Sequence, residues 1–140
     1  MNDYIDQLKM LNNKALQNGD VPVSAIIFCN DKIISKGDNT REKYNNPLLH
    51  AEVVAVQKAA RKLKTWNLSD CDIICTLKPC KMCTEILRSA KIKRIYYIVD
   101  NTKEINNVIE LTKIKCNQED YIANQYNRNC NNITHQNFGK

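Results

Sequence analysis

The sequence contains no run of apolar residues that approaches the ~18–20 residues needed to span a membrane. Hydrophobic residues nevertheless make up 43% of its 140 positions, which is enough for a folded core. No internal repeat or linker interrupts the chain. We therefore expect a single domain over residues 1–140, because two domains of ordinary size need a longer chain.

The first ten residues, MNDYIDQLKM, also lack the apolar stretch of a secretory signal, being charged and amphipathic. We therefore expect a cytoplasmic protein. In a reducing compartment the seven cysteines are not expected to form a disulfide framework. An odd and unevenly spaced set is better explained by two metal ligands, with the others as small core or surface residues.

The charge balance is basic, since 21 Lys and Arg residues against 15 Asp and Glu residues give a net charge of +6. A basic balance favours an anionic partner such as RNA, because each neutralised phosphate releases counterions. Ordinary solubility also explains such a charge, so the charge alone does not select nucleic acid.

Hydrophobic periodicity predicts the secondary structure of the first hundred residues. Apolar residues at near-helical spacing indicate helices, and short β-branched runs indicate strands. The expected elements in chain order are a helix over 3–18, strands over 21–29 and 32–36, a polar loop over 38–49, a helix over 50–63, a strand over 71–77, a helix over 79–91 and a strand over 94–99. This order predicts an α/β fold, a mixed sheet with helices on both faces.

After residue 100 the pattern weakens. It indicates a short helix over 104–111, a last strand over 112–116 and a final helix over 120–128. The last dozen residues carry little apolar content, and we expect them to fray.

The stretch TLKPCKMC places Cys80 and Cys83 three residues apart directly after Pro79. On a helix such residues share a face, so both thiols can reach one ion. A helix start also favours thiolate over thiol. Taken alone, this spacing fits a redox pair or two unrelated core cysteines as well as a metal site.

His50 and Glu52 change this balance in favour of a metal. On an ideal helix two residues at this spacing point about 200° apart, so they can converge only at a helix entry. Three protein ligands with the fourth position open are typical of catalytic zinc. A neighbouring carboxylate that is not a ligand can move protons. We predict that His50, Cys80 and Cys83 bind one Zn²⁺ per chain and that Glu52 is catalytic.

Together, the two stretches form the H-x-E…P-C-x-x-C signature of zinc nucleobase deaminases. The chain resembles the cytidine-deaminase-like superfamily, and within it the bacterial tRNA-specific adenosine deaminases. The resemblance covers about residues 1–100. Its other matching pieces are Asp20-Val21-Pro22-Val23, Asn39, Pro47 before His50, and Thr76-Leu77 with Met82 around the cysteine motif.

The resemblance implies a three-layer α/β/α fold with a mixed, mostly five-stranded sheet, a homodimer, and conversion of the wobble adenosine of a tRNA anticodon to inosine. It implies that Asn39 contacts the target base and that the backbone around Ser24 and Ala25 lines the pocket. Pro79 joins them in the substrate-binding set.

Several positions depart from the family pattern. Lys78 stands where the family has Glu, Ser24 where it has Gly, and Leu49 where it has Ala. Residues 100–111 contain none of the family's glycines, and the C-terminal aromatic residues are sparse. Because those regions shape the RNA-binding surface in the family, two alternatives stay open. One is a deaminase of free cytosine, cytidine or guanine, and the other is a zinc-binding paralogue without catalysis.

Overall fold

The computed structural model describes residues 2–100, 110–116 and 118–138. Its centre is a five-stranded sheet in the order β2-β1-β3-β4-β5. The strands are β1 Ser24–Cys29, β2 Lys32–Asp38, β3 Asp72–Leu77, β4 Arg94–Val99 and β5 Glu110–Lys113. β1 pairs antiparallel with β2 and β3, while β4 pairs parallel with β3 and β5. The predicted mixed sheet is therefore confirmed.

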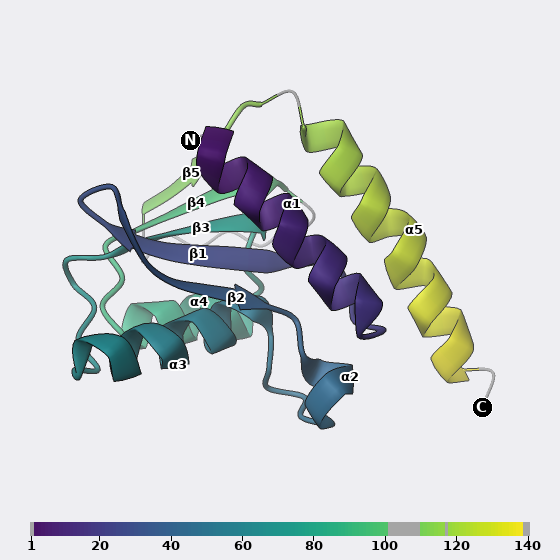
Figure 1. Cartoon of the computed structure of the whole chain (residues 1–140), viewed down its shortest axis with the longest axis horizontal. Helices are drawn as coiled ribbons and strands as arrows, with labels where there is room; N and C mark the ends of the chain where they lie inside the picture. Colours follow the sequence, from purple (N-terminus) through teal and green to yellow (C-terminus); the bar gives the residue numbers. More distant parts are fainter. Residues whose placement is uncertain (1, 101–109, 117, 139–140) are drawn as a thin grey trace.

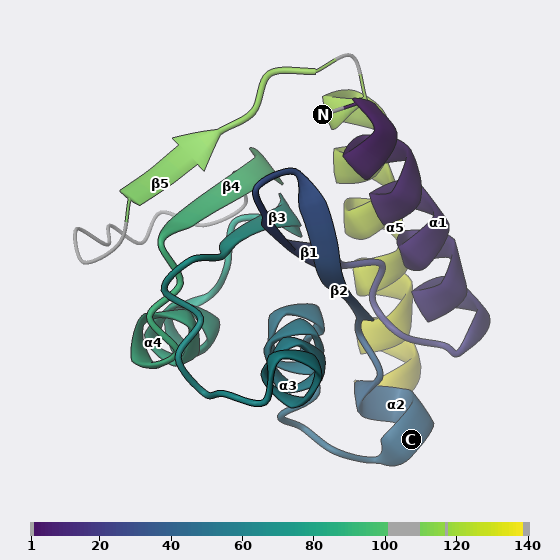
Figure 2. The ribbon, with the colours of Figure 1, turned by 60° about the vertical axis from the view of Figure 1, so that its left-hand side comes forward.

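Helices cover both faces of this sheet (Figure 1 and Figure 2). α1 Asn2–Gln17 and α5 Glu119–Phe138 lie side by side on one face, and α3 Ala51–Leu63 and α4 Lys81–Ser89 lie on the other. The short α2 Arg41–Tyr44 connects β2 to α3. In the part of the chain that the structure describes, no helix combines the length and apolar character needed to cross a membrane.

The core lies in the two interfaces between sheet and helices. Successive residues of a strand point to opposite faces, so strands covered on both sides are apolar without alternation. The central strands follow this rule, with fully buried Ile26, Ile27, Ile73, Ile74, Ile95 and Ile98. The continuous β-branched runs in the sequence therefore reflect burial on both faces.

Some element boundaries differ from the predicted ones for local reasons. β1 begins at Ser24 and not at Val21, because Pro22 has no N–H for the sheet and the N–H of Val23 bonds back to Val21 O at 2.9 Å. α4 begins at Lys81, after the predicted start at residue 79. The predicted polar loop contains the one-turn helix α2.

The C-terminal predictions need larger corrections. The predicted helix over 104–111 is wrong for Glu110 and Leu111, which begin β5 and pair with Arg94 and Ile95 of β4; the earlier part of that range lies outside the described residues. The last strand ends at Lys113. α5 continues through Phe138, beyond the predicted end at 128 and into the part expected to fray. No Gly or Pro interrupts residues 119–138, so nothing local ends the helix.

Gly37 in β2 lets α3 approach the sheet closely. A Cβ atom at this position would lie 2.7 Å from Ala55 N and still closer to Ala51 O, both backbone atoms of α3. Backbone atoms within a helix cannot move aside singly. The absence of a side chain at Gly37 therefore sets the position of the first turn of α3, on which Glu52 lies.

We expect Gly37→Ala to lower the free energy of unfolding by about 1–3 kcal/mol, the usual cost of overpacking a tight contact. Urea unfolding of the two proteins measures this difference. The matched control is Gly19→Asn, because Gly19 has open space around it and a positive φ of 76° that Asn tolerates. If both variants lost the same free energy of unfolding, the close approach of α3 to Gly37 would not be the cause.

Candidate active site

His50 and Glu52 converge because the chain enters α3 between them. His50 is the N-cap residue, with an extended backbone (φ −65°, ψ 155°), and its side chain makes no capping hydrogen bond. The N–H of Ala51, the first residue of α3, donates to Asn39 Oδ1 at 2.8 Å. The imidazole of His50 is thus left for another role. Glu52 follows in the first helical turn and is only 3% exposed.

Cys80 and Cys83 occupy the equivalent position on α4. Cys80 is the N-cap residue, again with an extended backbone (φ −68°, ψ 172°), and Cys83 lies in the first turn. The backbone N–H of Cys83 donates to Cys80 Sγ at 3.5 Å. Cys80 is exposed and Cys83 is buried. The cysteine motif therefore places one thiol at the end of the helix and the other on its inner face.

The structure brings the three predicted ligands together. The Nδ1 atom of His50 lies 3.5 Å from Cys83 Sγ, and the ligand atoms of His50, Cys80 and Cys83 all lie within 4.8 Å of one another. Hydrogen bonds from Cys83 and His50 lower the pKa of Cys80 to about 4, while the same bond to Cys80 raises the pKa of Cys83. The two shifts have opposite directions because the two sulfur atoms share one hydrogen bond.

The Glu52 carboxylate lies beside this cluster with one oxygen unsatisfied. Its Oε1 is buried, and within the described residues it has no hydrogen-bond partner. Burial raises the pKa of Glu52. Buried polar atoms normally have partners, and an exception calls for an explanation such as a catalytic role or a bound ion. Two sulfur donors, one imidazole and an uncommitted carboxylate fit a zinc ion that keeps its fourth position open.

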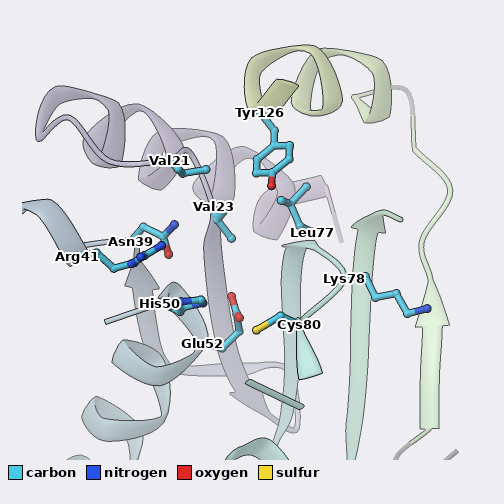
Figure 3. Close-up of a pocket in the computed structure, with 10 residues that line it drawn as sticks. All are labelled: Val21, Val23, Asn39, Arg41, His50, Glu52, Leu77, Lys78, Cys80 and Tyr126. Carbon is cyan, nitrogen blue, oxygen red and sulfur yellow. The ribbon is translucent and has the colours of Figure 1, made fainter. Parts of the chain in front are cut away.

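A pocket of about 210 Å³ opens above the cluster. This is below the ~300–1,000 Å³ of sites for drug-sized ligands, so it suits a single heterocyclic ring. Figure 3 shows Glu52, His50 and Cys80 at its base and Tyr126 of α5 above them. Its lining residues are Val21, Val23, Asn39, Arg41, His50, Glu52, Leu77, Lys78, Cys80 and Tyr126.

The predicted substrate-binding residues divide into two groups. Asn39 lines the pocket, whereas Ser24, Ala25 and Pro79 are buried and are not among its lining residues. The Ser24 side chain faces α1, where its Oγ lies 2.7 Å from Asn12 Oδ1 and 2.9 Å from Leu8 O.

Sequence reasoning assigned no pocket role to Arg41 or Tyr126. Arg41 stands two residues after Asn39, so that proximity could have drawn attention to it. Tyr126 is one of the sparse C-terminal aromatic residues in the region that shapes the RNA-binding surface in the family, but only the packing of α5 brings it to the pocket.

Lys78, one of the departures from the family pattern, is among the residues that line the pocket, but its side chain points away from His50, Glu52 and Cys80 (Figure 3). Its Nζ lies 3.9 Å from a carboxylate oxygen of Asp100 and 5.9 Å from the ring centroid of Tyr97. The positive charge therefore lies near Asp100 and Tyr97, away from Glu52.

Comparison with known families shows which part of the chain matches one of them. A family model described as the cytidine and deoxycytidylate deaminase zinc-binding region matches residues 2–99. This range contains α1 to β4 with the three cluster residues and Glu52. It ends before β5 and α5, so the helix that carries Tyr126 lies outside it.

Two curated relatives are named tRNA-specific adenosine deaminase. The chain is 43% identical over 91 residues to the Rickettsia bellii protein, covering 64% of this chain and 63% of that one. It is 39% identical over 84 residues to the Aquifex aeolicus protein, and the match covers 60% of this chain and 56% of that one. The chain thus spans less than two thirds of the length of these relatives.

Solved structures share the fold. A chain from a study of A-to-I editing by tRNA:A34 deaminases at the wobble position superimposes with a TM-score of 0.80 at 20% identity, covering 89% of this chain and 99% of that one. Guanine deaminase from Bacillus subtilis gives a TM-score of 0.66 at 20% identity, and the match covers 91% of this chain and 94% of that one. The expected three-layer α/β/α deaminase fold is confirmed.

We expect the protein to take up one zinc ion per chain and to lose this capacity when a ligand is removed. Cys83→Ser and His50→Ala should bind less than one equivalent, because two remaining ligands hold zinc weakly. Titration of the metal-free proteins with zinc against a chromophoric chelator measures this. Cys29→Ser, which changes a cysteine outside the cluster, is the control. Full zinc affinity in Cys83→Ser would rule out this ligand set.

The buried carboxyl of Asp38, next to the pocket residue Asn39 in the chain, predicts an effect of pH on stability. Asp38 is 2% exposed, and its Oδ2 atom has no hydrogen-bond partner among the described residues. Burial raises the pKa of Asp38 above its ordinary 3.8, although Lys14, Lys58 and Lys43 act in the opposite direction. A raised pKa means that the folded state holds this proton more tightly than the unfolded state does.

The contribution of Asp38 to stability is therefore complete below pH 3.8 and is lost as the pH rises through the higher pKa of the folded state. We expect Asp38→Asn to gain stability relative to the wild type over this rise, and the difference to level off once the folded carboxyl is ionised. Urea unfolding across a pH series measures the difference. If the stability difference between Asp38→Asn and the wild type were constant over the whole pH series, the pKa of Asp38 would not be raised in the folded state.

Proposed function

Because the chain belongs to the cytidine and deoxycytidylate deaminase zinc-binding family, we propose that it is a zinc-dependent hydrolytic deaminase that converts the wobble adenosine of a tRNA anticodon to inosine. One observation carries the chemistry. The unsatisfied, buried Oε1 of Glu52 lies beside the cluster of His50, Cys80 and Cys83, at the base of a pocket that suits one ring. The tRNA substrate is supported by the names of the relatives and by the net charge of +6.

The roles of the residues follow from their positions. His50, Cys80 and Cys83 would hold the zinc ion. Zinc bound there supplies a Lewis acid that makes water a usable nucleophile near neutral pH. Asn39 lines the pocket, and its Oδ1 already accepts from Ala51 N. Its Nδ2 is thus the donor that we assign to the base.

Glu52 moves the protons of the reaction. Its Oε1 accepts a proton from the attacking water as the water oxygen bonds to C6 of adenine, and it passes this proton to the adjacent ring nitrogen. It then takes the second water proton and delivers it to the exocyclic amine, and the C6–N bond breaks to release ammonia. Burial favours the protonated form of Glu52, which suits a group that both accepts and donates within one turnover.

The proposal includes a cytoplasmic homodimer. The homodimer is implied by the resemblance to bacterial tRNA-specific adenosine deaminases, and the cytoplasmic location is an expectation from the sequence. The deaminase of a free base or nucleoside remains the second candidate, supported by the ring-sized pocket and by a fold that is shared with a guanine deaminase.

The test compares substrates with the zinc-loaded protein. We expect inosine to form in an anticodon stem-loop RNA that carries adenosine at the wobble position, with one ammonia released for each inosine. Free adenosine, cytosine, cytidine and guanine should release none. Glu52→Gln should retain its zinc and lose about 10²–10⁴-fold in rate, as is typical when a proton-transfer group is removed.

Each other outcome contradicts the proposal in a distinct way. Ammonia from a free base and none from the RNA would establish the second candidate. If the wild type and Glu52→Gln were equally inactive on every substrate while both bound one zinc, the protein would be a zinc-binding paralogue without catalysis. Liquid chromatography of the digested RNA identifies inosine directly.

A further inference from the structure

Cys29 and Cys71 stand at corresponding ends of two neighbouring strands (Figure 1). Cys29 is the last residue of β1, and Cys71 directly precedes β3. Neither belongs to the cluster of His50, Cys80 and Cys83. We propose that Cys29 and Cys71 form a reversible disulfide by exchange with a low-molecular-weight disulfide, and that this bond stabilises the fold without changing the cluster. The inference goes beyond the proposed function and does not depend on it.

The register of the sheet places the two cysteines opposite each other. β1 and β3 pair antiparallel, with Phe28 opposite Asp72. The same register, continued by one residue, sets Cys29 opposite Cys71. Opposite residues of an antiparallel pair have Cα atoms about 4.5 or 5.5 Å apart and side chains on the same face of the sheet. A disulfide needs Cα atoms about 4.4–6.8 Å apart, so this register satisfies the requirement.

The two side chains also contact each other. A hydrogen bond joins Cys71 to Cys29, and Cys29 packs against the core cluster that contains Cys71. Both cysteines are free in this structure, which therefore represents the reduced form. Cys71 is 2% exposed, whereas Cys29 is half-buried. A reagent in solution therefore meets Cys29 first.

Backbone contacts hold both residues in this arrangement. Cys29 is followed by the two-residue turn of the β1–β2 hairpin, residues 30–31, in which both φ angles are positive (51° and 64°) as a tight hairpin turn requires. At Cys71 the N–H donates to Leu68 O and the carbonyl accepts from Lys93 N, each at 2.9 Å. The two sulfur atoms can therefore bond by side-chain rotation, without rearrangement of the strands.

A third cysteine of the same strand pair shows that the arrangement is specific. Cys75 of β3 is fully buried, and it stands opposite Ala25 of β1 and Tyr97 of β4. In the part of the sheet that the structure describes, Cys75 thus has no cysteine across from it. The register therefore selects Cys71 and not Cys75 as the partner of Cys29.

The exposures set the order of two exchange steps. The Cys29 sulfur attacks one sulfur of the small disulfide R–S–S–R and breaks its S–S bond. The leaving R–S⁻ takes the Cys29 proton, and a mixed disulfide with R–S remains on Cys29. The Cys71 sulfur then attacks Cys29 Sγ, and its proton goes to the second leaving R–S⁻. The protein loses two electrons and two protons, and the small disulfide becomes two R–SH molecules.

The environment of Cys71 agrees with its place in the second step. Burial, followed by the charges of Cys29 and Asp70, raises the pKa of Cys71 to about 11. Because the thiolate is the attacking form, Cys71 is a poor nucleophile toward reagents in solution near neutral pH. It can still react with a sulfur that is held beside it. Cys71 is therefore the resolving thiol and Cys29 the attacking one.

The position of the bond predicts its consequence. It would close the chain between residues 29 and 71, which contains β2, α2 and α3. Such a cross-link restricts the unfolded chain and so stabilises the folded one. The pocket residues Val23 and Leu77 lie at the other ends, Val23 directly before β1 and Leu77 at the end of β3. The bond should therefore leave the pocket and the cluster unchanged.

The test exposes the zinc-loaded protein to oxidised glutathione and maps its cysteines by mass spectrometry. We expect the peptides that contain Cys29 and Cys71 to be joined, and excess dithiothreitol to restore both thiols. The joined protein should unfold at higher urea concentration, with an unfolding equilibrium constant lowered on the order of 10²-fold. Its zinc content, measured with a chromophoric chelator, should not change.

Three variants identify the roles of the two thiols. Cys29→Ser should leave Cys71 as a free thiol. Cys71→Ala should keep one glutathione on Cys29, because the resolving thiol is gone; alanine adds no unpartnered buried hydroxyl. Cys116→Ser is the matched control, since Cys116 is half-buried as Cys29 is, and this variant should still form the bond. The Cys29→Ser result is decisive even if Cys71→Ala does not fold.

Each contrary outcome overturns a stated part of the inference. If the wild type formed no bond between Cys29 and Cys71, or kept glutathione on Cys29, the disulfide would be wrong. A disulfide between Cys80 and Cys83 in its place would have the same meaning. An unchanged urea midpoint in the joined protein would overturn the stabilisation, and loss of zinc would overturn the independence of the cluster. None of these results bears on deamination, which the RNA assay tests separately.

Discussion

The cluster of His50, Cys80 and Cys83 depends on two helix N-termini that meet at one end of the sheet. His50 and Cys80 both have extended backbones and both stand immediately before a helix. A residue in that position projects off the helix end, so its side chain can meet one from the first turn of the other helix. Gly37 makes this possible by letting α3 lie close to β2, and Asn39 accepts a hydrogen bond from the N–H of Ala51, the first residue of α3. These two contacts fix the start of α3, where His50 and Glu52 lie.

The same end of the molecule also concentrates unfavourable electrostatics. Among the described residues, the buried side-chain oxygens without a hydrogen-bond partner belong to Asp20, Asp38 and Glu52. Such groups cost stability, and real proteins tend to keep such exceptions at functional sites. The fully buried isoleucines of the central strands offset this cost.

Much of the first hundred residues was predictable, because the signals there are local. Continuous β-branched runs and helical spacing reflect burial, and they identified the strands and helices to within a few residues. The misplaced start of β1 came from Pro22, which removes a backbone donor. Beyond residue 100 the prediction failed for Glu110 and Leu111, since an edge strand is defined by its pairing with β4 and not by its own composition. The extent of α5 was missed because polar, asparagine-rich turns resemble a fraying end.

The sequence by itself determined the chemistry of the site. Residue type and short spacing decide which atoms can hold a metal, and the i, i+3 cysteines with a histidine and glutamate at a helix entry carry that information locally. Only the tertiary structure decided the walls of the pocket. Asn12 and Gln125, which hold α5 and thereby Tyr126 in place, are 113 residues apart. Contacts at that separation leave no local pattern, because each partner looks like an ordinary polar helix residue until packing brings them together.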